Sequence, residues 1–372
     1  MIESPPFWMW IVGFLLVLGP LVTVHELGHY LVGRWFGVKS VVFSVGFGKE
    51  IAGFTDRHGT RWKLSALPLG GYVQFKGDMN PASMPDADEL SRLSPGERGG
   101  HFHFAPLWQR ALIVAAGPVT NFLVAIAILA GFAMVYGQAV TPAVVDSVVE
   151  QSAAERAGIA VGDRILAVDN RQTPSFEDVA KIISINPGER VNVVLERDGR
   201  RIELPATIET LVESDNFGNQ FRTGRLGVGA AERVIEPVSA IAAVPLAIRQ
   251  TGEITNMMVT GVWQIVTGRR PVEELGGPVK IAKFSAEQLS LGWTSFIWFV
   301  AMISINLAFI NLLPIPALDG GHLAFYAAEA VRRKPVSAQG QEWAFRTGMV
   351  FVIALMLFVT INDVASLPVF GS

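Results

Sequence analysis

The sequence predicts a polytopic α-helical membrane protein with about four transmembrane helices. Half of its 372 residues are hydrophobic and only 17% are charged, whereas soluble domains carry about 25% charged residues. The charged residues also avoid a few segments long enough to cross a hydrocarbon core of about 30 Å as helices. The net charge of -3 gives no reason to expect a nucleic-acid partner.

Residues 1–33 are the first predicted transmembrane helix, because Ser4 to Val24 holds no charged residue. A cleaved signal peptide is the alternative. The stretch before this run has Glu3 but no Lys or Arg, and no small-residue cleavage site follows the run. We therefore expect a retained helix.

Three later segments complete the set of predicted spans. The third and fourth surround the uncharged runs Gln288–Leu318 and Thr347–Asn362, and the fourth run is the shortest. The predicted boundaries of these three spans are 107–136, 288–322 and 343–366.

The distribution of charge predicts the topology. The loops 34–106 and 323–342 are rich in Lys and Arg, while both tails lack them. The positive-inside rule places both loops in the cytoplasm and both termini outside. Residues 137–210, β-rich with a hairpin-turn signal at Asp198-Gly199, are then extracytoplasmic, as is a linker with interfacial helices over 211–287.

The first span ends in His25-Glu26-Leu27-Gly28-His29. Two His four residues apart on a helix share one face, separated by about 6 Å of rise, and both can bind one zinc ion. Glu26 can act as general base on a water molecule. The chain has no cysteine, so His, Asp and Glu are the available ligands. The alternative is an unrelated interfacial cluster, but three ionisable groups at the end of an apolar span are costly without a function.

Asp319 is the predicted third ligand of a catalytic zinc ion, which also needs one open position. It is the first acid after the long uncharged run and follows Pro314 and Pro316, which break the helix. A carboxylate on such a bend can turn inward. Taken alone, Asp319 is equally well explained as a cap of the next helix. The HELGH motif favours the ligand.

Further polar residues surround these motifs. Asn306 and Asn311 are candidates for binding the substrate backbone or stabilising the oxyanion, with interhelical hydrogen bonds as an equal alternative. His322 either supports the ligands or is solvated.

In the second span, Gly117, Pro118 and Asn121 form a GPVTN cluster. Gly and Pro permit a kink and a close helix approach there. We interpret the cluster as mainly structural, bringing this helix against the first one.

HELGH, GPVTNF and NLLPIPALDGGH, in this order, resemble the motifs of the site-2 protease family, most closely its bacterial RseP-type branch, the regulator-of-sigma-E proteases. The resemblance covers nearly the whole chain. It implies an intramembrane zinc metalloendopeptidase that binds one Zn²⁺ per chain through His25, His29 and Asp319, with Glu26 as the base. The intramembrane Asn and Pro residues of that family match Asn306, Asn311, Pro314 and Pro316.

Two more segments are similar to parts of this family. TPAVVDSVVEQSAAERAGIAVGDRILAVDN resembles the start of a bacterial PDZ domain, which implies one extracytoplasmic PDZ-like domain. Val41 to Phe75, with GFG and GGYVQF, resembles a membrane-associated β-hairpin beside the active site. RseP-type members often carry two PDZ domains, but the extracytoplasmic segment has room for one.

The resemblance implies a multi-pass protein of the bacterial inner membrane with its active site near the cytoplasmic side. Its expected substrate is a single-span membrane protein in the lipid bilayer, such as an anti-sigma factor, first trimmed by an upstream site-1-type protease. Two other functions remain open on the sequence alone. They are a membrane metal transporter or sensor, and a non-catalytic scaffold that uses its PDZ-like domain.

Overall fold

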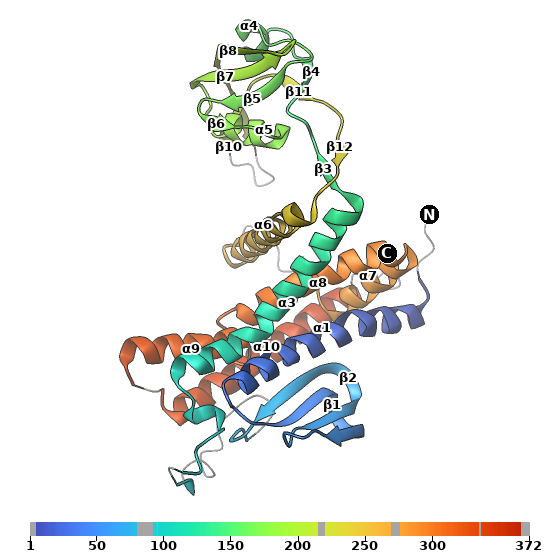
Figure 1. Cartoon of the computed structure of the whole chain (residues 1–372), viewed down its shortest axis with the longest axis vertical. Helices are drawn as coiled ribbons and strands as arrows, with labels where there is room; N and C mark the ends of the chain where they lie inside the picture. Colours follow the sequence, from blue (N-terminus) through green and yellow to red (C-terminus); the bar gives the residue numbers. More distant parts are fainter. Residues whose placement is uncertain are drawn as a thin grey trace. The chain divides into compact units, whose positions relative to one another are not determined.

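The computed structural model describes residues 5–79, 92–94, 96–214, 220–268, 276–334 and 336–365. The chain divides into two compact units: unit 1 is Met1–Gly131 with Val244–Ser372, and unit 2 is Phe132–Ala243 (Figure 1). Among the described residues, four helices are long and apolar enough to cross a membrane, as predicted. They are α1 (Phe7–Trp35), α3 (Leu107–Tyr136), α8 (Trp293–Leu312) and α10 (Ala338–Ala365).

Helix α1 is the central element of unit 1. It packs against α7 (Pro278–Ser290), α8 and the neighbouring β-sheet. Its Gly13 permits the approach of α7, because a Cβ there would lie 3.0 Å from the backbone nitrogen of Ala286. Because α1 runs on to Trp35 without a break, its HELGH residues keep helical spacing and face a packed interior.

The third predicted span is shorter than expected. Helix α8 ends at Leu312, because Leu313 precedes a proline and is held in the extended region (φ -62°, ψ 140°). The chain then turns at Ala317, whose φ of +96° is uncommon for a residue with a side chain. Helix α9 (Asp319–Arg332) follows. The segment that was expected to begin as a loop at residue 323 is therefore helical up to Arg332.

Strands β1 (Ser40–Thr55) and β2 (Arg61–Phe75) pair antiparallel and lie beside α1 (Figure 1). The sheet is folded more tightly than a plain hairpin, since the first half of β1 pairs with both ends of β2; Phe43, for instance, pairs with Trp62 and with Val73. Gly46 permits the bend, because its φ is +90° and a Cβ there would lie 2.7 Å from the carbonyl oxygen of Leu67.

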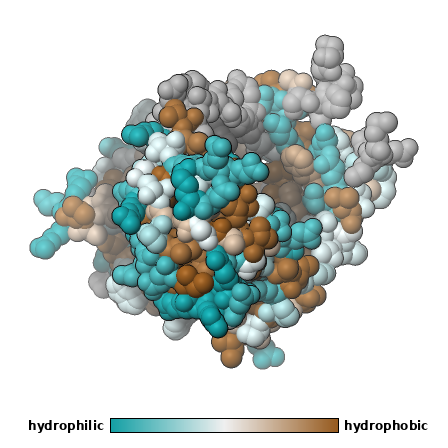
Figure 2. Space-filling model, turned by 90° about the horizontal axis from the view of Figure 1, so that it is seen from above, coloured by the Kyte–Doolittle hydropathy of each residue, from teal (hydrophilic) through white to brown (hydrophobic). Residues whose placement is uncertain are grey.

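Unit 2 contains a four-stranded sheet of order β6-β5-β7-β8 with short flanking elements. The turn predicted at Asp198-Gly199 is confirmed, because both residues have positive φ and Arg197 pairs with Arg200 across it. In the space-filling view the nearest face is mostly hydrophilic, with hydrophobic patches between the polar side chains (Figure 2). The strands are β3 (Gln138–Val140), β4 (Val145–Val148), β5 (Arg164–Val168), β6 (Arg171–Gln172), β7 (Arg190–Arg197), β8 (Arg200–Thr207), β9 (Glu209–Ser214), β10 (Gln220–Arg225), β11 (Val228–Ala230) and β12 (Val234–Glu236).

Two short helices of unit 2 are α4 (Ala153–Ala157) and α5 (Phe176–Ser184). Each begins at a serine cap, and α5 has a complete capping box between Ser175 and Asp178. The longer helix α6 (Ala240–Val266) begins in unit 2 and continues into unit 1, within the segment where interfacial helices were expected.

A bidentate ion pair fixes the edge of the unit 2 core. Asp163 accepts two hydrogen bonds of 2.7 Å from Arg197 and one of 2.8 Å from the backbone N–H of Ala160. The carboxylate is 1% exposed and the guanidinium 35%. Burial disfavours the ionised carboxylate, but the bonds from Arg197 and Ala160 outweigh it and hold the pKa of Asp163 below its usual value.

We expect Arg197→Met to lower the free energy of unfolding of unit 2, because it leaves a buried carboxylate without its main partner. Hydrogen exchange of the β5 and β7 amides in the full-length protein measures this change. Arg201→Met is the control: its side chain is 68% exposed and 3.9 Å from Glu203, so its effect should stay within about 0.5 kcal/mol.

The lowered pKa of Asp163 also sets the direction of a pH effect. Its stabilisation is present above the unfolded pKa of about 3.9 and is lost as pH falls through the folded value. Arg197→Met should therefore remove part of the acid sensitivity of unit 2. An unchanged acid transition in this variant would contradict the role of the ion pair.

Candidate metal centre

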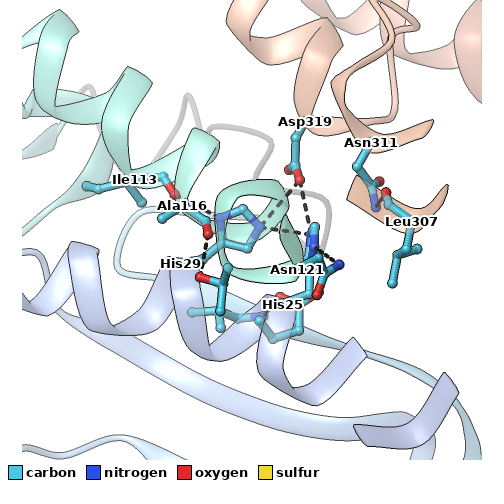
Figure 3. Close-up of polar contacts among 11 residues, drawn as sticks. His25, His29, Ile113, Ala116, Asn121, Leu307, Asn311 and Asp319 are labelled. Carbon is cyan, nitrogen blue, oxygen red and sulfur yellow. Dashed lines mark hydrogen bonds and ion pairs between the residues drawn. The ribbon is translucent and has the colours of Figure 1, made fainter. Parts of the chain in front are cut away.

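The structure brings the three predicted metal ligands together inside unit 1 (Figure 3). His25 and His29 lie one turn apart on α1 and are 6% and 8% exposed. Their Nε2 atoms are 3.2 Å apart. Asp319, the first residue of α9, places Oδ2 at 3.1 Å from Nε2 of His25 and 3.5 Å from Nε2 of His29.

These three atoms fit a tetrahedral metal ion. Ligands at about 2.0–2.1 Å from a common tetrahedral ion are about 3.3 Å from one another, and the three separations lie on either side of that value. Asp319 Oδ2 is buried and has no hydrogen-bond donor of acceptable geometry among the described residues. Burying a bare carboxylate oxygen is costly, so its convergence with two imidazole nitrogens favours a cation between them.

Helix α3 contacts both imidazole rings. Nδ1 of His29 donates to the carbonyl oxygen of Ile113 at 2.8 Å, which leaves Nε2 free for a metal. Nδ1 of His25 lies 3.1 Å from the side-chain amide nitrogen of Asn121. Gly117 lies between these two contacts, and a Cβ there would lie 2.7 Å from Nε2 of His25. The close approach expected from the GPVTN cluster thus occurs at Gly117, one residue before the proline that lies inside α3.

Glu26 lies next to the ligands and reaches the β-sheet. Its Oε2 accepts a hydrogen bond of 3.1 Å from the backbone N–H of Val73 in β2. The carboxylate lines the same cavity as the two histidines. This bond holds one carboxylate oxygen in place, while the cavity wall keeps the group beside the metal position.

A cavity of about 500 Å³ opens on the three ligands. Its wall combines these polar groups with apolar side chains from the β-sheet, α3 and α10, including Phe47, Phe75, Ile113, Phe345 and Met349. The mixture of a few polar groups in an apolar wall is typical of ligand sites.

The two predicted asparagines differ in position. Asn311 lines the cavity and donates to the carbonyl oxygen of Leu307 at 3.0 Å. Asn306 is half-buried on α8 and is not among the lining residues. Residues five apart on a helix point about 140° away from each other, so one cavity wall does not include both. A substrate role for Asn306 stays a prediction.

His322 also lines the cavity. Its side chain is half-buried. This position fits the supporting role more than the solvated alternative.

Sequence reasoning missed the groups that orient the site. They are the carbonyl of Ile113, the N–H of Val73 and the direct contact of Asn121 with an imidazole. The contacts that backbone N–H and C=O groups make cannot be predicted from residue type. An intramembrane Asn four residues after a helix-approach glycine is a signal that could have indicated Asn121, because buried amides require partners.

Comparison with known proteins gives one family. The model of peptidase family M50 matches residues 13–355. A protein of Agrobacterium fabrum named "Putative zinc metalloprotease" is 46% identical over 363 residues, covering 96% of each chain. A protein of the same description from Rhizobium meliloti is 43% identical over 355 residues, covering 94% of this chain and 95% of its own. Metalloprotease MmpA of Caulobacter vibrioides is 35% identical over 387 residues, covering 98% of this chain and 97% of its own.

Proposed function

Because this chain belongs to peptidase family M50 and is a zinc metalloprotease, we propose that it is an intramembrane endopeptidase. It hydrolyses peptide bonds in or near the transmembrane segment of single-span membrane proteins. His25, His29 and Asp319 hold zinc in this proposal, and Glu26 is the base.

The position of the metal centre along α1 carries the proposal. Leu31 and Trp35 follow the histidines and are 53% and 81% exposed, and Trp108 at the start of α3 is 58% exposed. Exposed Trp side chains are typical of the membrane–water interface. His29 precedes Trp35 by six residues, which is about 9 Å along a helix. The metal centre therefore lies on the hydrocarbon side of this aromatic level.

The chemistry follows from the residues around the cavity. When bound, zinc supplies a Lewis acid that polarises the scissile carbonyl and makes a water molecule acidic enough to react near neutral pH. Glu26 accepts a proton from this water and returns it to the leaving amine. Asn311 on the cavity wall is placed to hydrogen-bond the substrate backbone. Both imidazoles have no free acceptor left for that proton once they hold the metal.

Exposed apolar side chains support a membrane location for the β1–β2 sheet. A soluble sheet would cover or replace them. They are Phe47, Ile51, Phe54, Leu64 and Leu67, each at least 41% exposed. The outer edge of β2 carries the Val73 N–H that reaches Glu26. A substrate helix that unwinds loses its backbone hydrogen bonds, and pairing with the β2 edge next to this point replaces them.

The charge pattern supports a bacterial inner-membrane protein with the metal centre near the cytoplasm. Arg34 lies in the last turn of α1, Arg110 lies near the start of α3, and Arg332 is the last residue of α9. Both termini and unit 2 are then extracytoplasmic. We also propose that unit 2 is a PDZ-like domain that admits substrates already trimmed by an upstream protease. An anti-sigma factor fits this substrate class, and family resemblance alone supports that identity.

The test uses the purified full-length protein in liposomes with a single-span substrate labelled at both ends. Mass spectrometry of the fragments locates the cut. We expect a cut inside the apolar segment or within a few residues of it, and no cut in the same sequence when its apolar segment is replaced by a polar one. Cleavage confined to polar substrate segments would contradict the intramembrane proposal.

Removal of zinc is expected to abolish this cleavage. A zinc chelator should lower the rate at least 100-fold, and one equivalent of Zn²⁺ per chain should restore it, because three protein ligands define one site. Metal analysis of the same samples gives the stoichiometry. Full activity in a sample with no measurable metal would exclude the zinc mechanism.

A further inference from the structure

Asn121 is the most completely buried polar side chain in contact with a predicted ligand. The residue is 0% exposed and its amide nitrogen lies 3.1 Å from Nδ1 of His25. Its Oδ1 is buried and has no hydrogen-bond partner among the described residues. Its main-chain oxygen accepts from the hydroxyl of Ser304 on α8 at 2.8 Å. The backbone of Asn121 is thus fixed by α8, while half of its amide is unpaired.

The orientation of this amide determines which nitrogen of His25 carries the proton. When the amide nitrogen donates to Nδ1, the proton of a neutral His25 must sit on Nε2, where it faces Asp319 Oδ2 at 3.1 Å. A protonated Nε2 has no lone pair for a metal. This orientation of the amide therefore does not suit metal binding at Nε2.

A half-turn of the amide gives the orientation that suits metal binding. Oδ1 then faces Nδ1 of His25 and accepts its N–H, and the lone pair of Nε2 points at the metal position. The number of unpaired amide atoms is the same in both orientations, so the half-turn itself costs little. Metal binding at Nε2 decides between them.

We propose that Asn121 is a positioning residue for zinc: with Oδ1 toward the ring, its amide accepts a hydrogen bond from Nδ1–H of His25 and leaves Nε2 to the metal. The carbonyl oxygen of Ile113, which can only accept, likewise accepts a hydrogen bond from Nδ1–H of His29. Ile113, Gly117 and Asn121 are four residues apart, so one stripe of α3 orients both rings. An amide serves both tautomers of His25 without placing a second buried negative charge beside Asp319.

The test measures zinc affinity by chelator competition on the full-length protein in detergent. Asn121→Leu keeps the size but removes the acceptor, and we expect zinc affinity to fall about 10- to 100-fold. Asn121→Asp in its ionised form can only accept, so it supports the tautomer of His25 that binds metal through Nε2, and we expect affinity at least equal to wild type. The visible spectrum of the Co²⁺-loaded forms should match wild type for Asn121→Asp and change for Asn121→Leu.

Ser304→Ala is the matched control, because it removes the other contact of Asn121 and leaves the amide in place. We expect unchanged zinc affinity. An equal loss in Ser304→Ala and Asn121→Leu would overturn the proposal in favour of helix packing. Loss of zinc in Asn121→Asp would overturn it too, because donation to His25 would then be the required contact. This second comparison decides the question even if Asn121→Leu does not fold.

The proposal rests on the zinc site of the proposed function, and the wild-type protein separates the two. A wild type that holds no zinc overturns the site itself. Zinc in the wild type together with undiminished affinity in Asn121→Leu overturns only the role of Asn121.

Discussion

Glu26→Gln is expected to lower the rate of proteolysis at least 100-fold while one zinc ion stays bound. A general base contributes about 10²- to 10⁴-fold, and a glutamine amide does not accept a proton at neutral pH. The glutamine carbonyl still accepts from the backbone N–H of Val73, which preserves the position of the side chain. Fragment yield from a liposome assay and zinc content of the same preparation are the two measurements.

A carboxylate remote from the cavity serves as the control for the loss of charge. Glu253 on α6 is 59% exposed and 3.9 Å from Arg249, so Glu253→Gln should cleave at the wild-type rate. Wild-type cleavage by Glu26→Gln would exclude Glu26 as the base. Loss of zinc from Glu26→Gln would instead show that this side chain maintains the metal site.

Gly117→Ala is expected to remove both zinc and activity through one added methyl group. The new Cβ would lie 2.6 Å from Cε1 of His29 and 2.7 Å from Nε2 of His25. Real Cβ atoms do not approach other atoms below 3.0 Å, so the rings or the helices must move apart. A shift of this size disrupts three-ligand geometry, and we expect zinc content well below one per chain.

Gly131→Ala, in the same helix, isolates this steric effect. A Cβ at Gly131 meets no atom within 4 Å. Alanine is favoured over glycine in a helix by about 1 kcal/mol, so this variant should keep zinc, activity and thermal stability. Normal zinc content in Gly117→Ala would mean that α1 and α3 can separate at this point without disturbing the ligands.

The sequence was sufficient for the parts of the molecule that depend on residue type. Long uncharged runs predicted four apolar spans because runs of this length match the thickness of the hydrocarbon core of a membrane. The HELGH spacing predicted a shared helix face for His25 and His29, and the structure has it. Asp319 could be proposed as a ligand because it follows the prolines at the end of α8, whose last residue is Leu312, and because the HELGH motif calls for a third ligand.

The remaining features depend on contacts between distant backbones, which composition does not encode. The double pairing of Phe43 within the β1–β2 sheet follows from a bend at Gly46 rather than from strand alternation. Helix α9 was missed up to Arg332 because positive charge near a span indicates a loop as readily as an interfacial helix. The carbonyl oxygen of Ile113 accepts a hydrogen bond from His29 only because α3 packs against α1 at this point.

The contribution of α3 to the metal centre has a consequence for biosynthesis. His25 and His29 are made first, their partners on α3 follow, and Asp319 is translated only after unit 2 is complete. A nascent chain with its first two helices in the bilayer therefore has both imidazoles oriented but no third ligand. Hydrolytic competence arises late, when α8 and α9 have joined the bundle. Because a metal ion binds a site assembled from three ligands more tightly than the separate helices, zinc binding is expected to favour the assembled bundle.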